Sequence, residues 1–125
     1  MATTLLSIVE SAAHPNLSGA YQRLGIVETK LNSMRKALAT LKKQPFDFIV
    51  AEFFYGYGSN YAGVNISNLD VMLYSLQKYS PETRVIVLVD KTEYQYVDKL
   101  NDILPLHAVM LYPVSEQAIT QLLGD

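Results

Sequence analysis

Val85-Ile86-Val87-Leu88-Val89 is an unbroken apolar run of strand length, and most of its residues are β-branched. A strand with no polar face must be covered on both sides, as strands are in the parallel sheets of α/β proteins. Apolar residues with helical spacing precede and follow this run: Leu69, Met72, Leu73 and Leu76, then Val97, Leu100 and Leu104. The run therefore predicts a buried strand of a sheet that helices cover on both faces.

The same alternation of strands and helices extends over the rest of the chain. Further strands are expected at residues 5–9, 26–29, 46–51 and 108–111, with helices after each. Expected helix starts are Asn32 or Ser33, Ser67 with Asp70, Thr92 with Gln95, and Ser115. Helical crossovers between parallel strands are right-handed, and the connections between successive elements are short. We therefore expect an α/β fold with a doubly wound, five-stranded parallel sheet in the order 2-1-3-4-5.

Length and composition limit the class of protein. Residues 1–125 fit one domain, half of the residues are hydrophobic, and we expect no separate effector domain. The chain has no cysteine, which excludes disulfides, thiolate metal sites and a cysteine nucleophile, and which suits the cytoplasm. A net charge of −2 does not indicate the basic surface that nucleic-acid binding requires. No apolar stretch has the length of a signal peptide or membrane span.

Sheets of this kind bind ligands beyond the carboxyl ends of their strands, where the strand order reverses. The residues that leave those ends are Glu10-Ser11, Glu52-Phe53, Val89-Asp90 and Tyr112-Pro113. A site is therefore expected there. His14 and His107 do not suggest a catalytic pair, and no metal-ligand spacing or phosphate-binding loop is present.

Over nearly its whole length the sequence resembles the receiver (CheY-like) domains of bacterial two-component response regulators. Phe46-Asp47-Phe48-Ile49-Val50-Ala51-Glu52 resembles their third strand, and Arg84 to Val89 their fourth. Lys36-Ala37-Leu38 is similar to part of their second helix, and Leu111-Tyr112-Pro113-Val114 to the end of their fifth strand. The resemblance implies the same CheY-like, flavodoxin-like fold.

The resemblance also identifies a degenerate phosphorylation site. Glu10 and Ser11 stand where two acids would hold magnesium, and Glu52 stands where an aspartate would accept the phosphoryl group. Val89 replaces a hydroxyl residue that senses this group, and Tyr112 replaces a lysine that pairs with it. Phosphoryl transfer depends on positioning and on neutralising charge, so these replacements together predict a pseudo-receiver without phosphorylation, bound metal or enzymatic activity.

Several alternatives remain open at this site. Glu52 or Asp90 could serve an unorthodox phospho-acceptor that binds magnesium, with Lys91 in place of the missing lysine. Glu52 itself has two interpretations. Its longer carboxylate could imitate a phosphorylated aspartate. Alternatively, it is an unconstrained residue, tolerated because strand ends face water.

An aromatic loop follows Glu52, with Phe53, Phe54, Tyr55, Tyr57 and Tyr61 as its candidate binding residues. Tyrosine is enriched in binding surfaces because it combines a large rigid ring with a polar tip. The loop could bind a partner, or it could fold back and plug the acidic pocket. A small-molecule sensor that uses these tyrosines is a third functional option.

We therefore expect an atypical receiver-like domain that acts as a protein–protein interaction module in bacterial signal transduction. Its protein partner is unknown, and a homodimer through the face of helix 4, strand 5 and helix 5 is one arrangement. We expect neither nucleic acid nor a membrane as a partner.

Overall fold

The computed structural model describes residues 2–56 and 67–124. Five strands form one parallel sheet in the order β2-β1-β3-β4-β5, which confirms the predicted topology. The strands are β1 (Thr4–Ile8), β2 (Val27–Leu31), β3 (Phe48–Glu52), β4 (Arg84–Val89) and β5 (Ala108–Leu111). The helices are α1 (Ser18–Arg23), α2 (Met34–Lys43), α3 (Asp70–Tyr79), α4 (Tyr94–Val97), the 3₁₀ helix η1 (Asp98–Asp102) and α5 (Glu116–Gly124).

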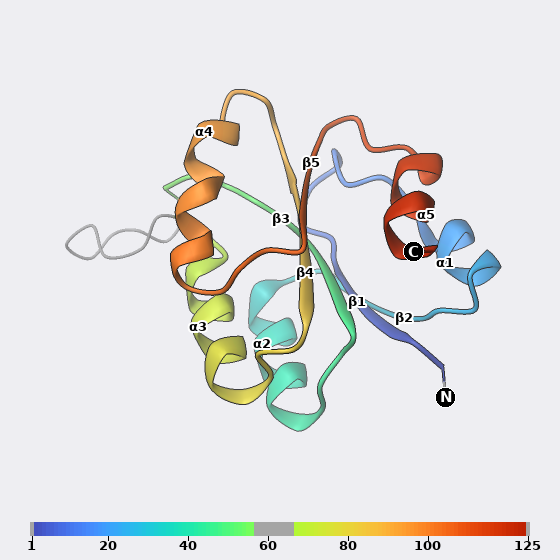
Figure 1. Cartoon of the computed structure of the whole chain (residues 1–125), viewed down its shortest axis with the longest axis horizontal. Helices are drawn as coiled ribbons and strands as arrows, with labels where there is room; N and C mark the ends of the chain where they lie inside the picture. Colours follow the sequence, from blue (N-terminus) through green and yellow to red (C-terminus); the bar gives the residue numbers. More distant parts are fainter. Residues whose placement is uncertain (1, 57–66, 125) are drawn as a thin grey trace.

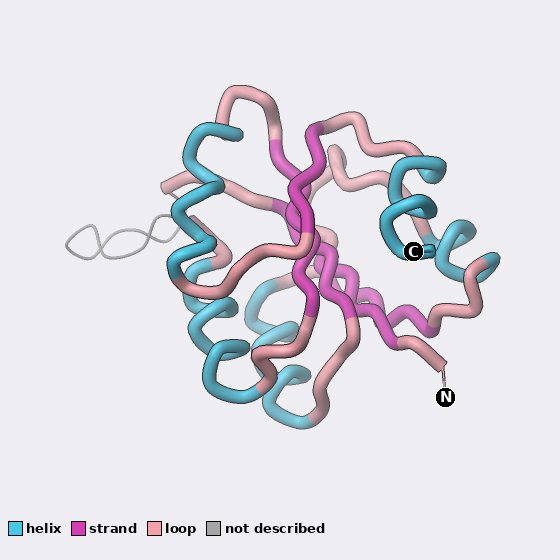
Figure 2. Tube along the Cα trace, viewed as in Figure 1, coloured by secondary structure: helices cyan, strands magenta, loops and turns pink. Residues whose placement is uncertain are grey.

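The sheet is a twisted central layer with helices on both sides (Figures 1 and 2). Alternate residues of each strand point to opposite faces, so two apolar clusters form. Val85, Val87 and Val89 pack with α2, α3 and α4, whereas Ile86 and Leu88 pack with α1 and α5. The run that predicted the fold is therefore buried on both faces.

Two of the predicted helix starts are confirmed. Ser33 caps α2, because its Oγ accepts a hydrogen bond from the Lys36 backbone N–H at 3.2 Å. The Ser115 Oγ accepts one from the Ala118 N–H at 3.1 Å in the first turn of α5. In both places a hydroxyl oxygen satisfies a backbone donor that the first turn of a helix leaves free.

The other two helix starts differ from prediction. Asp70 accepts hydrogen bonds from Ser67 as a capping box would require, but α3 begins only at Asp70. The capping box of Thr92 and Gln95 is wrong: Thr92 donates its backbone N–H to Asp90 instead, at 3.0 Å. The helix expected up to Leu104 is a single turn, α4, followed by the 3₁₀ helix η1.

In the part of the chain that the structure describes, no helix has the length and apolar character needed to cross a membrane.

Candidate functional site

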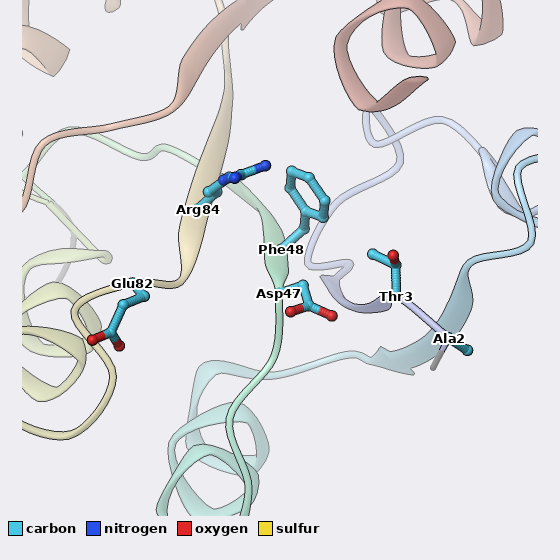
Figure 3. Close-up of a pocket in the computed structure, with 6 residues that line it drawn as sticks. All are labelled: Ala2, Thr3, Asp47, Phe48, Glu82 and Arg84. Atoms are coloured by element: carbon cyan, nitrogen blue, oxygen red, sulfur yellow. The ribbon is translucent and has the colours of Figure 1, made fainter. Parts of the chain in front are cut away.

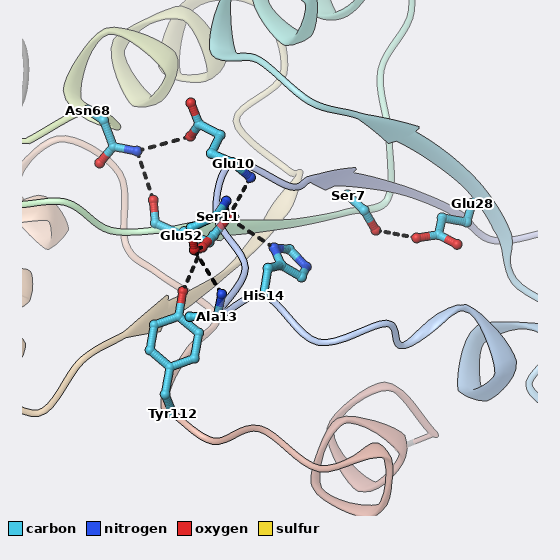
Figure 4. A network of polar contacts seen from close by, with 9 residues as sticks. All are labelled: Ser7, Glu10, Ser11, Ala13, His14, Glu28, Glu52, Asn68 and Tyr112. Atoms are coloured by element: carbon cyan, nitrogen blue, oxygen red, sulfur yellow. Dashed lines mark hydrogen bonds and ion pairs between the residues drawn. The ribbon is translucent and has the colours of Figure 1, made fainter.

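Glu52 is the last residue of β3, and its side chain lies at the carboxyl edge of the sheet with 0% of its surface exposed. The parallel register pairs β3 with β1 on one side and β4 on the other. The segment after β1 therefore lies beside Glu52, and Tyr112, which follows β5, reaches it as well (Figure 4). The expectation that Glu52 faces water is wrong, because side chains and loops from these neighbours cover it.

Both carboxylate oxygens of Glu52 accept hydrogen bonds. Oε2 accepts from the backbone N–H groups of Glu10 at 2.6 Å and Ser11 at 3.0 Å. Oε1 accepts from the Ser11 hydroxyl and from the Tyr112 hydroxyl, the latter at 3.0 Å. A carboxylate offers about four lone-pair sites, so these contacts use the whole acceptor capacity of the group.

His14 lies against the same carboxylate, although nothing in the sequence pattern assigned it to the site. Its Nδ1 is 3.4 Å from Oε2 of Glu52, and its side chain is 2% exposed. Within the described part of the chain this nitrogen has an ion-pair distance to Glu52 but no hydrogen bond of good geometry. The contact joins the loop after β1 to the end of β3, so only the tertiary structure shows it.

Asn68 is a second residue that sequence reasoning missed. Its Nδ2 donates to the Glu52 backbone carbonyl at 2.8 Å and to Glu10 Oε1 at 3.3 Å. Its Oδ1 accepts from the Phe54 N–H at 2.8 Å. Asn68 therefore links the loop after β1, the end of β3 and the segment before α3 (Figure 4).

Burial and hydrogen bonding act in opposite directions on the Glu52 carboxyl. Burial alone would raise its pKa, but the contacts from His14, Ser11, the Glu10 backbone and Tyr112 outweigh burial and lower the pKa to about 2. Burial raises the pKa of the Tyr112 hydroxyl, and the nearby Glu52 charge raises it further. Glu52 is therefore held as an anion and Tyr112 as a neutral donor.

The structure brings four of the five predicted site residues into one network: Glu10, Ser11, Glu52 and Tyr112. Val89, the fifth, is buried in the apolar cluster beneath α2, α3 and α4. Asp90 is exposed, and its carboxylate accepts hydrogen bonds from Thr92. Lys91 is also exposed, as expected of a loop lysine.

The described part of the aromatic loop does not plug the site. Phe53 is 1% exposed and packs in the apolar core, whereas the Tyr55 ring stacks on Tyr96 with centroids 3.7 Å apart and planes at 18°. Tyr57 and Tyr61 lie outside the described residues. Of the tyrosines that the structure describes, Tyr112, which lies outside this loop, contacts the Glu52 carboxylate.

The donor set does not fit magnesium. Glu52 has its acceptor positions filled by protein hydrogen bonds, and the Ser11 hydroxyl is itself bonded to Glu52. Over residues 2–56 and 67–124, no group of three acidic, histidine or cysteine side chains could hold a metal ion. Glu10 has a carboxylate beside Asn68, but burial raises its pKa and so disfavours its charged form.

A cavity of about 470 Å³ lies at the other, amino edge of the sheet, lined by Ala2, Thr3, Asp47, Phe48, Glu82 and Arg84. Arg84 extends over the Phe48 ring, 5.5 Å from its centroid (Figure 3). The charged residues of the cavity wall are two acids, Asp47 and Glu82, and one base, Arg84. None of them belongs to the Glu52 network. This cavity is therefore separate from the carboxyl edge at which Glu52 lies.

Comparison with known proteins identifies the architecture. No protein-family model matches the chain, and no curated protein matches it. Solved structures do match. A response regulator from Thermotoga maritima has a TM-score of 0.71 at 17% identity, over 99% of this chain and 96% of that one. The fold is that of a receiver domain.

Two further structures agree with this assignment. The chemotaxis response regulator CheY4 of Vibrio cholerae matches with a TM-score of 0.73 at 16% identity, over 99% of this chain and 98% of that one. A response regulator from Burkholderia pseudomallei, solved with a phosphorylated aspartic acid, a calcium ion and citrate, matches with a TM-score of 0.73. Its identity is 17%, over 97% of this chain and 66% of that one. At such identities the likeness establishes the CheY-like fold.

Proposed function

We propose that this chain is a receiver-like signalling domain that works without phosphorylation and acts by binding another protein. The observation that carries the proposal is the saturated, fully buried carboxylate of Glu52. A nucleophile needs a free lone pair and an open path to the phosphoryl donor. Glu52 has neither within the described structure.

The surroundings of Glu52 support the same conclusion. Tyr112 donates a neutral hydroxyl where the resemblance expects a lysine cation, and Val89 provides no hydroxyl beside it. Neither residue can neutralise a developing phosphoryl charge. As part of the proposal, the domain catalyses no reaction of its own.

The setting of the proposal is signalling in the bacterial cytoplasm. Its support is the receiver fold shared with bacterial response regulators and the absence of cysteine.

We also propose that two copies associate through the face of α4, β5 and α5. Exposed apolar surface supports this contact, since Tyr94 is 53% and Leu111 45% exposed there.

Incubation with acetyl phosphate and Mg²⁺, followed by intact-mass spectrometry, tests whether the domain accepts a phosphoryl group. The wild type should keep its mass. The matched control carries Ser11→Asp, Glu52→Asp, Val89→Thr and Tyr112→Lys together, which restores every position that the resemblance marks as replaced. This variant should gain a phosphoryl group.

A stable phosphoryl adduct on the wild type would overturn the proposal. Loss of that adduct in Glu52→Gln or in Asp90→Asn would then identify the acceptor of an unorthodox receiver. Circular dichroism of each variant shows whether it is folded, so a missing adduct cannot be confused with unfolding.

A further inference from the structure

Basic side chains gather on the two neighbouring helices α2 and α3. Five of the ten basic residues of the chain lie in these helices, whereas Asp70 is their only acid among the twelve of the chain. Asp70 is 1% exposed, and its carboxylate is bonded to Ser67. The exposed charges of α2 and α3 are therefore all positive, although the chain as a whole carries a charge of −2.

The basic side chains point to solvent together because of helical spacing. α2 and α3 pack side by side on one face of the sheet (Figure 1). Their core-facing positions are apolar, which leaves four exposed cations on α2 and one on α3: Arg35, Lys36, Lys42, Lys43 and Lys78. Residues seven apart share a helix face, so Lys36 lies in line with Lys43 and Arg35 with Lys42.

Large apolar side chains are also exposed on α3. Val71 and Tyr74 are each 52% exposed on α3, and Tyr79 is 58% exposed at its end. Val71, Tyr74 and Lys78 follow the spacing i, i+3, i+7, so they lie along one outward stripe of α3. Lys78 lies 5.3 Å from the centroid of the Tyr79 ring, which brings a cation and an aromatic ring together at the surface.

A hollow of about 400 Å³ continues this surface at the start of α2. Its lining is Val9, Lys30, Leu31, Asn32 and Lys36. The Lys36 ammonium donates to the Asn32 side-chain oxygen at 3.2 Å, which holds it at the rim. Two ammonium groups beside an apolar wall suit a side chain that ends in a carboxylate.

We propose that this surface binds an acidic segment of a partner protein. We call it the basic face and define it as Lys30, Arg35, Lys36, Lys42, Lys43, Val71, Tyr74, Lys78 and Tyr79. Carboxylates of the segment pair with the lysines, one of them in the hollow at Lys30 and Lys36, and its apolar side chains pack on Val71 and Tyr74. The inference rests on the proposed function, a domain that acts through protein contacts, and names the chemistry of its partner.

The surface fits a protein segment better than nucleic acid. Exposed tyrosine and valine are anchors for apolar side chains, which a phosphate backbone lacks. The exposed charges of α2 and α3 are all positive, whereas the neighbouring α4–η1 segment also carries exposed acids such as Asp98 and Asp102. A long polyanion or a flat anionic membrane would meet those acids, but a short acidic segment would not.

Fluorescence anisotropy with a labelled peptide of alternating Glu and Leu tests the basic face. The key variant is Lys30→Glu with Lys36→Glu. Glutamate at position 36 suits α2, since it falls in the first turn behind the Ser33 cap. The matched control is Lys91→Glu with Lys99→Glu, which makes the same charge change on exposed residues of the α4–η1 side.

The key variant should bind the peptide about tenfold more weakly, and the control should stay within about twofold of wild type. Raising the salt from about 0.05 M to about 0.5 M should weaken wild-type binding, since short screening lengths remove the attraction. Tyr74→Ser should also weaken binding, with the equally exposed Tyr94→Ser as its control.

Three results would overturn the inference: no binding of the acidic peptide, equal losses in both charge variants, or equal affinity for a Lys-Leu peptide. Tighter binding to duplex DNA or to phosphatidylserine vesicles than to the peptide would reassign the face to those partners. None of these outcomes changes the mass measured after acetyl phosphate treatment, so failure of the basic face and failure of the proposed function are separate results.

Discussion

At the scale of single residues, Tyr112, which stands where the resemblance implies a lysine, helps to hold Glu52. Tyr112 lacks a cation but carries a hydroxyl, and this hydroxyl donates to Glu52 at 3.0 Å. A neutral donor can satisfy a buried carboxylate without bringing a second charge out of water. Glu52 and Tyr112 therefore act as a structural pair in which the acid is a hydrogen-bond acceptor.

Tyr112→Phe removes this hydroxyl and should lower the free energy of unfolding by about 1.5–3 kcal/mol, because it leaves a buried carboxylate oxygen short of a donor. Urea denaturation measures the loss. Tyr94→Phe, at a tyrosine that is 53% exposed, is the control and should change little. A Tyr112→Phe protein as stable as wild type would show that the hydroxyl contributes nothing to the network.

The lowered pKa of Glu52 predicts loss of stability in acid. Its pKa of about 2 in the folded chain lies below the ordinary glutamate pKa of 4.5 that applies once the chain unfolds. The stability that the Glu52 carboxylate contributes is therefore present above pH 4.5 and is lost as the pH falls toward 2. Since each unit of pKa is worth about 1.4 kcal/mol, the loss between these two pKa values is about 3.5 kcal/mol.

Free energies of unfolding measured across this range should fall less steeply in Glu52→Gln than in wild type. Burial raises the pKa of Glu10, so this residue has the opposite effect on stability. Its protonation in acid favours the folded chain. A Glu10→Gln protein should therefore keep the acid loss that belongs to Glu52. Identical pH profiles for wild type and Glu52→Gln would contradict the assignment.

At the scale of elements, α4 is one turn long and depends on contacts outside itself. Isolated helices of this length are unstable in water. The Tyr55 ring stacks on Tyr96, and the Glu93 carboxylate accepts the Tyr55 backbone N–H at 3.2 Å. The segment after β3 therefore holds the start of α4 against the body of the domain.

Tyr96→Ala should loosen α4 and η1, because it removes the stacking partner of Tyr55. Hydrogen–deuterium exchange should become faster in residues 94–102 and stay unchanged in α3, which serves as the internal reference. In a double-mutant cycle, Tyr55→Ala and Tyr96→Ala should couple by about 0.5–1.5 kcal/mol. Strict additivity of the two substitutions would mean that the rings stabilise the fold independently.

The elements also show where prediction from sequence works and where it does not. Val85–Val89 and the helical spacing around it predicted the sheet correctly, since period and apolarity are local signals. The Thr92 start failed because Asp90, two residues earlier, competes for the same N–H. His14 and Asn68 carried no local signal, because their contacts to Glu52 come from distant parts of the chain.

At the scale of the whole molecule, three regions of the described surface differ in character. The carboxyl edge is closed over Glu52, the α2–α3 side is cationic, and the α4–β5–α5 side exposes Tyr94 and Leu111. β5 is an edge strand, so one of its sides has no neighbour in the sheet. Two separate surfaces are thus available, one for a second copy and one for an acidic partner.

Leu111→Glu should disrupt the proposed homodimer, because it places a charge in the middle of the exposed apolar contact. Sedimentation velocity should show a dimer for wild type and a monomer for the variant. Val71→Glu on α3, at an apolar residue that is 52% exposed, is the control and should remain dimeric. A wild-type chain that sediments as a monomer at high concentration would contradict the dimer.

The clamp formed by Asn68 has a consequence for protein engineering. Asn68 binds the Phe54 N–H and the Glu52 carbonyl, and Tyr55 bridges to Ser67, so the two ends of the segment 57–66 are joined at their base. Lengthening a loop whose ends are already fixed costs little, about 0.6 kcal/mol for each doubling of its length. The contacts that join Phe54 and Tyr55 to Ser67 and Asn68 therefore keep the end of β3 beside the start of α3, so an epitope or reporter peptide inserted between these anchor points should leave the sheet intact.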